Sequence, residues 1–232
     1  MNRLWMTTLM VVLGLAGWAW TDEFPLKEHP DSKDWPDLFG PNLADANFPK
    51  GVWYVQDGVL TAKEDRCIWT KKQYENFILD LEFKNAPGSN SGVFVYCSDP
   101  QNFILNSVEI QICDDYAEKW AKMPRSWHSG AIGAIFGHQP PTEQVVKKAG
   151  EWNRMTIVCK GPMIYVMLNG KPVNTFDMRK YTSAKKNPDG TDIPPWLSKP
   201  KAELPTKGYI GLQGKHGDAP IYFRNLKIKP LD

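Results

Sequence analysis

The sequence predicts an all-β protein, an antiparallel sandwich or barrel, from three observations. About ten short segments either alternate apolar with polar residues or form short apolar runs. Two connections carry Asp57-Gly58 and Asn169-Gly170, pairs that tolerate the positive φ of tight hairpin turns. No long window shows the 3.6-residue period of an amphipathic helix, and only residues 116–123 are expected to form a helical turn or two. Strands without intervening helices argue against a parallel α/β sheet.

The clearest strand is the segment 77–84. Its residues Phe77, Leu79, Leu81 and Phe83 alternate with positions that turn polar from Asp80 onward. Such alternation is typical of a strand with one face in the core and one face in water. Further strands are expected at residues 52–55, 59–61, 92–97, 107–112, 152–159, 163–168, 171–175, 208–213 and 221–229.

The first 19 residues have the features of a secretory signal peptide. Arg3 precedes the apolar run 6–16, which is shorter than the roughly 20 residues that a membrane-spanning helix needs. Small residues at positions 17 and 19 fit cleavage after Ala19, with an uncleaved anchor as the alternative. Residues 20–36 then form an irregular lead-in, and residues 37–232 form a single domain. The Pro-rich segment 181–206 is expected to be a long surface loop.

Composition excludes several classes of protein. The chain has 28 Lys and Arg against 26 Asp and Glu, so it lacks the cationic surplus of a nucleic-acid binder. There is no cysteine at the cleavage site for a lipid anchor, so the mature protein is expected to be periplasmic or extracellular, without membrane insertion. The sequence leaves the oligomeric state open. Four cysteines, with no C-x-x-C pair, leave disulfides and buried thiols equally open: Cys67, Cys97, Cys113 and Cys159.

Strand alternation also predicts which polar side chains point away from the core. In the segment 107–112, Val108, Ile110 and Ile112 form the apolar face, so Glu109 and Gln111 emerge together on the other face. An ordinary water-facing sheet would show the same alternation. Glycine-rich stretches nearby favour a ligand site, because glycine in or beside a strand often marks a close approach to the backbone.

A second strand contributes to the same expectation. In the segment 208–213, Ile210 and Leu212 are the apolar pair, which leaves Gln213 on the opposite face, with His216 just beyond the strand. Acid, amide and imidazole groups are therefore expected on outward faces of two strands.

The order of the short motifs along the chain carries a resemblance. These motifs are Trp53-Tyr54-Val55-Gln56-Asp57-Gly58-Val59-Leu60, Asn90-Ser91-Gly92-Val93-Phe94, Val108-Glu109-Ile110-Gln111-Ile112, Gly130-Ala131-Ile132, Gly150-Glu151-Trp152-Asn153, Leu168-Asn169-Gly170, Gly211-Leu212-Gln213 and Phe223-Arg224-Asn225-Leu226-Lys227-Ile228. In this order, over about residues 37–231, the chain resembles the 3-keto-disaccharide hydrolase family of exported bacterial proteins. The resemblance implies a concanavalin A-like jelly-roll sandwich of two antiparallel sheets.

The resemblance also implies cleavage of glycosides whose sugar is already oxidised at C3, by a hydrolase or a lyase. A C3 ketone acidifies the C2 hydrogen, so one general base, a donor near the C3 oxygen and a proton source for the leaving group suffice. Glu109 is the expected base, and His216 the expected acid or enolate donor. The same two residues could instead hold a divalent metal ion. Contacts to the oxidised sugar are expected from Asn90, Gln111, Trp127, His128, Gln213 and Arg224.

Two other functions use the same fold. A non-catalytic carbohydrate-binding module would need the aromatic and amide groups but not the pairing of Glu109 with His216. A conventional glucanase would need two acids on one strand, and the position two residues after Glu109 is Gln111. Loop tryptophans such as Trp120 and Trp196 could stack on a sugar ring or cover an edge of the core.

Overall fold

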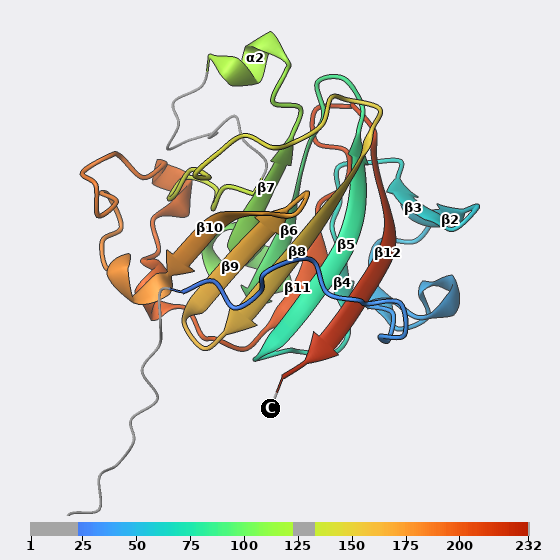
Figure 1. Cartoon of the computed structure of the whole chain (residues 1–232), viewed down its shortest axis with the longest axis horizontal. Coiled ribbons are helices and arrows are strands. Elements are labelled where there is room, and N and C mark those ends of the chain that lie inside the picture. Colours follow the sequence, from blue (N-terminus) through green and yellow to red (C-terminus); the bar gives the residue numbers. More distant parts are fainter. Residues whose placement is uncertain (1–22, 123–132, 232) are drawn as a thin grey trace, which may run out of the picture.

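The computed structural model describes residues 23–122 and 133–231, which fold into two antiparallel sheets packed face to face (Figure 1). The predicted all-β jelly-roll sandwich is confirmed. The five-stranded sheet contains, in order, β1 (Ala46–Asn47), β4 (Ile68–Thr70), β11 (Tyr209–Leu212), β6 (Asn90–Cys97) and β7 (Val108–Cys113). The seven-stranded sheet contains, in order, β10 (Lys171–Asp177), β9 (Met163–Leu168), β8 (Trp152–Lys160), β5 (Phe77–Asn85), β12 (Ile221–Pro230), β3 (Val59–Ala62) and β2 (Trp53–Gln56).

Helical structure in the described residues is confined to short turns. The helix α1 (Phe103–Asn106) precedes β7, and α2 (Glu118–Ala121) lies within the segment expected to be helical. Short 3-10 helices lie at Pro41–Leu43, Pro100–Asn102, Met178–Lys180, Pro195–Leu197 and Lys201–Glu203. None of the described helices is long and apolar enough to cross a membrane.

All the strands that the sequence predicts are present, and two further strands were not predicted. The extra strands β1 and β4 have two and three residues, too few for a period-two pattern to show. The segment 181–206 forms a loop with 3-10 turns. The expected signal peptide, Trp127 and His128 lie outside the described residues.

The core between the sheets follows the predicted alternation. On β7 the side chains of Val108, Ile110 and Ile112 are completely buried in one hydrophobic cluster. Leu79 and Leu81 of β5 pack into the same cluster from the other sheet. Burial of this many apolar side chains is the main stabilising contribution to the sandwich, and it fixes which residues of each strand face outward.

The four cysteines are free thiols, and three of them are buried. Cys113 donates a hydrogen bond from Sγ to Oδ1 of Asp115 over 3.2 Å. Of the two alternatives left open by the sequence, the structure therefore has thiols that pack as small apolar side chains.

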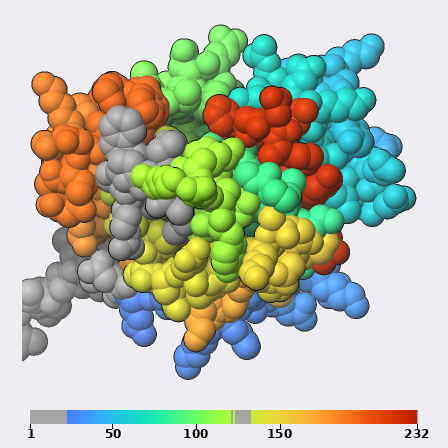
Figure 2. Space-filling view, turned by 90° about the horizontal axis from the view of Figure 1, so that it is seen from above, coloured from blue at the N-terminus to red at the C-terminus, as the bar shows by residue number. Residues whose placement is uncertain are grey.

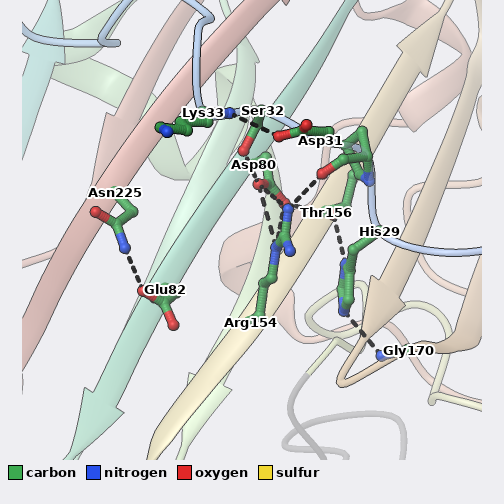
Figure 3. A network of polar contacts seen from close by, with 11 residues as sticks. His29, Asp31, Ser32, Lys33, Asp80, Glu82, Arg154, Thr156, Gly170 and Asn225 are labelled. Carbon is green, nitrogen blue, oxygen red and sulfur yellow. Dashed lines mark hydrogen bonds and ion pairs between the residues drawn. The ribbon is translucent and has the colours of Figure 1, made fainter.

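The lead-in crosses the outer face of the seven-stranded sheet, in front of β9, β8 and β5 (Figure 1). It is anchored by Asp80, a buried carboxylate that accepts hydrogen bonds from Ser32 and Thr156 and pairs with Arg154 over 2.8 Å (Figure 3). The Arg154 guanidinium also donates to the carbonyl of Pro30. A buried carboxylate with this many donors is fully satisfied, so the network holds the lead-in in place.

Candidate active site

The outer face of the five-stranded sheet carries the predicted polar residues. Because Val108, Ile110 and Ile112 point into the core, Glu109 and Gln111 point outward from β7. Register pairs Glu109 with Phe94 and Gln111 with Gly92 on β6, so side chains at these positions share one face.

Gly92 makes room for the carboxylate of Glu109. A Cβ atom at position 92 would lie 2.5 Å from Oε1 of Glu109 and 3.0 Å from its Cγ. The Glu109 side chain therefore lies across β6 rather than extending straight away from the sheet. Just after β11 the backbone N–H of Gln213 donates to the carbonyl of Gly92 over 2.9 Å, so the carboxylate lies next to the end of β11.

Two amides and the loop after β11 continue the polar surface. The Gln111 Nε2 donates to Oδ1 of Asn90 over 2.9 Å, and both side chains are buried. The carbonyl of Asn90 accepts from the backbone N–H of His216 over 3.2 Å. This hydrogen bond holds the loop after β11, which carries His216, beside β6.

His216 pairs with a residue that the sequence did not indicate. Its Nδ1 lies 2.5 Å from Oδ2 of Asp65, and both side chains are about half exposed. An ionised carboxylate can only accept, so Nδ1 carries the proton and Nε2 is the nitrogen left for proton transfer. Asp65 comes from the loop between β3 and β4.

The electrostatics of the site centre on Glu109 and Lys201. Burial raises the pKa of Glu109 to about 8, the nearby Lys201 ammonium opposes that rise, and the Asp65 carboxylate adds to it. Lys201 is itself buried, with Nζ donating to the carbonyl of Ser107 over 2.9 Å. Burial lowers the pKa of Lys201 to about 8, while Glu109 opposes that change. Each group thus favours the charged form of the other in a site that disfavours charge.

A cluster of aromatic rings borders the polar groups. Trp69 of β4 stacks on Phe94 with ring centroids 5.6 Å apart, and Phe103 contacts both rings. The Trp69 ring lies directly over Gly211, where a side chain would collide with it. Flat apolar surfaces of this kind suit the apolar face of a sugar ring.

Part of this surface lines a pocket of about 630 Å³, a volume within the usual range of small-molecule sites. We call it the site pocket. It is lined by Asp65, Cys67, Trp69, Phe103, Gln213 and His216, among others. In Figure 2 this side of the molecule, with the green segment near residue 100, lies opposite the blue lead-in.

The structure brings five of the eight predicted site residues to this face. Asn90 and Gln111 lie in its buried amide pair, Glu109 lies over Gly92, and Gln213 and His216 line the site pocket. Trp127 and His128 lie outside the described residues.

Arg224 is not part of this group. Phe223 points into the core from β12, so Arg224 faces outward from the seven-stranded sheet. It donates to Oε2 of Glu82 over 2.8 Å, and its guanidinium lies 4.0 Å from the ring centre of Trp152. Alternation predicts that Arg224 faces outward, but not from which sheet.

A second hollow, of about 480 Å³, lies beside the lead-in (Figure 3). Its charged side chains are largely engaged with one another: Asp80 binds Arg154, and Glu82 binds both Arg224 and Asn225. Such mutual pairing is typical of a structural network, so the site pocket is the better candidate.

The part of the chain that the structure describes contains no assembled metal site. Residues 23–122 and 133–231 contain no group of three or more His, Cys, Asp or Glu side chains placed to hold an ion. A divalent ion held by Glu109 and His216 stays a prediction from the sequence.

Comparison with known proteins places the chain in a family. The family model described as a 3-keto-alpha-glucoside-1,2-lyase-like domain matches residues 26–229. The chain belongs to this family. A curated 3-keto-disaccharide hydrolase of Bacteroides thetaiotaomicron is 25% identical over 178 residues, which are 69% of this chain and 60% of that protein. The chain thus matches less than two thirds of the length of this relative.

Solved structures agree with the family assignment. An inferred glycosyl hydrolase of Parabacteroides distasonis is 57% identical, with a TM-score of 0.81, and the match covers 85% of this chain and 99% of that one. Another inferred glycosyl hydrolase of the same organism is 25% identical with a TM-score of 0.64, and the match covers 82% and 90%.

The close approach of the Glu109 side chain to Gly92 predicts the effect of a substitution at position 92. Gly92→Ala should displace the Glu109 carboxylate and lower the free energy of unfolding by about 1–3 kcal/mol, the usual cost of overpacking. Chemical denaturation measures this change. In a Glu109→Ala background the same substitution should cost much less, because the colliding carboxylate is gone. Equal costs in the two backgrounds would show that Glu109 does not lie over Gly92.

Proposed function

We propose that this protein cleaves the glycosidic bond of 3-keto-glycosides by removing the C2 proton of the oxidised sugar. One observation carries the proposal: a half-buried carboxyl, Glu109, has its pKa raised to about 8 beside a pocket lined with amide, imidazole and aromatic groups. A general base near neutral pH needs a pKa in this range. Family membership supports the substrate class.

The proposed reaction has two stages. The Glu109 carboxylate takes the C2 proton, and the electron pair of the C2–H bond forms an enolate with the C3 ketone. That electron pair then forms the C1–C2 double bond as the C1–O bond breaks, and the departing oxygen takes a proton. A lyase releases this unsaturated ketone. A hydrolase adds water, with hydroxyl bonding to C1 and a proton returning to C2.

The remaining residues have supporting roles in this proposal. His216, oriented by Asp65, donates the proton to the departing oxygen or a hydrogen bond to the enolate. Asn90, Gln111 and Gln213 supply amide groups that position the sugar hydroxyls and the ketone. Lys201 is a positioning residue, because its ammonium favours the ionised form of Glu109.

The proposal also includes export. Residues 1–19 would be removed as a signal peptide, residues 20–36 would remain as the lead-in, and residues 37–232 would act in the periplasm or outside the cell on an oxidised sugar. The apolar run that supports this proposal is too short to span a bilayer.

The first test compares a 3-keto-glucoside with the same glucoside left unoxidised. We expect the protein to release product from the ketone alone, and Glu109→Gln to lower kcat by at least about a hundredfold, the usual contribution of a general base. Gln is uncharged at every pH, so the variant should be no less stable than the parent, which thermal unfolding checks. Parallel reactions with chelator test for an ion held by Glu109 and His216.

Two results would contradict this assignment. Retention of activity in Glu109→Gln would remove Glu109 from the mechanism. Tight binding of the keto-sugar without release of product would instead favour a carbohydrate-binding module.

The pH profile provides a second test. Glu109 acts only when ionised, and its raised pKa means that the carboxylate forms as the pH rises through about 8. We therefore expect kcat/KM to rise with pH below about 8, as Glu109 ionises. An unperturbed glutamate, with a pKa of about 4.3, would give a flat profile throughout that range. A flat profile between about pH 5.5 and 8.5 would contradict the assignment of a buried carboxyl as the base.

A further inference from the structure

An apolar groove adjoins the site pocket and has no part in the proposed chemistry. It has a volume of about 380 Å³ and lies between α1 and the 3-10 helix Pro195–Leu197. Ile104, Leu105 and Trp196 line it, with 46%, 37% and 45% of their surface exposed. Exposed apolar side chains gathered at one place usually mark a binding surface.

The groove shares part of its lining with the site pocket. Gln101, Phe103 and Ile104 line both spaces, so the groove and the site pocket lie side by side, close enough for two parts of one ligand. In Figure 2 the green segment near residue 100 abuts the orange-red segment near residue 200, consistent with the contact between α1 and the 3-10 helix. Its position next to the site pocket distinguishes this patch from the other exposed apolar residues, such as Tyr54 and Val55 on β2.

The walls of the groove are tied together. Lys199 Nζ donates to Oδ1 of Asn106 over 2.8 Å, which joins the loop after the 3-10 helix to the end of α1. Ser107 Oγ donates to the carbonyl of Phe103 over 2.6 Å and closes the last turn of α1. A surface held in this way loses little entropy when a ligand binds.

The chemistry of the lining indicates the ligand. Among the described residues that form the groove none carries a charge, and the polar groups are the side chains of Gln101, Asn102 and Ser198. Its described lining thus offers no charged partner for a phosphate, a carboxylate or an ammonium group. It suits a neutral, apolar or aromatic ring with a few hydrogen-bonding groups. None of the described lining residues can transfer a proton, so the reacting sugar belongs in the site pocket.

We propose that the groove is a subsite for the leaving group, and that the preferred substrates are 3-keto-glycosides with a neutral aromatic or apolar aglycone. This inference rests on the proposed function, because it assumes that the oxidised sugar lies beside Glu109. Binding energy from the part of a substrate that does not react can be used to orient the part that does. A stacked aglycone at Trp196 would hold the C1–O bond at the junction of the two spaces.

The test uses methyl and phenyl 3-keto-glucosides, each in both anomers, with Trp196→Ala as the variant. We expect the parent to prefer the phenyl substrate, and the variant to lose about tenfold in kcat/KM on the phenyl substrate and less than about twofold on the methyl one. Tyr54→Ala is the matched control, since Tyr54 is an exposed aromatic residue on the other sheet. It should leave both substrates unaffected.

Equal losses on the two substrates, or no preference for phenyl in the parent, would overturn the subsite. If the parent cleaves neither substrate, the proposed catalytic function fails, and the subsite is then judged by calorimetric binding of the phenyl 3-keto-glucoside. Weaker binding by Trp196→Ala than by Tyr54→Ala would support the subsite. Equal binding by the two variants, or none by the parent, would overturn it.

Discussion

The packing of β7 against the opposite sheet is the constraint on which the site depends. Val108, Ile110 and Ile112 are completely buried, so the strand cannot shift by one residue without moving three apolar side chains into water. That register fixes Glu109 on the outer face. Gly92 on the neighbouring strand then leaves the space in which the carboxylate lies. A general structural requirement, a filled core, thus places the residue proposed as the base.

Burial of Glu109 has a cost in stability that a catalytic role would justify. The pKa of Glu109 is raised in the folded protein, so folding favours its protonated form. The contribution of that form to the free energy of unfolding is complete below the unfolded carboxyl pKa of about 4.3 and is lost as the pH rises through about 8. Lys201 reduces the cost by favouring the ionised carboxylate, although it is buried too. Residues that lower stability at working pH are often found at functional sites.

Much of the fold and part of the site followed from alternation along single strands. That pattern located β5 and β7 and put Glu109 and Gln111 on one outward face, because it reports a property of each strand alone. It could not pair Asp65 with His216, or bring Lys201 to Glu109, because these contacts join segments that are far apart in the sequence. For the same reason it could not assign Arg224 to the opposite sheet. Gly92 was a usable signal, since the glycines beside the strands indicated a close approach of some group to the backbone.

The central claim is that Glu109 removes the C2 proton, and hydrogen exchange tests it without any bond cleavage. The 3-keto derivative of 1,5-anhydroglucitol carries no glycosidic group at C1, so removal of its C2 proton and return of one from solvent can be followed without cleavage of a glycosidic bond. In D₂O the account predicts deuterium at C2, observed by NMR, with the parent protein, and none beyond the buffer rate with Glu109→Gln. Equal exchange by the two proteins, or cleavage of keto-glycosides by a parent that exchanges nothing, would contradict it.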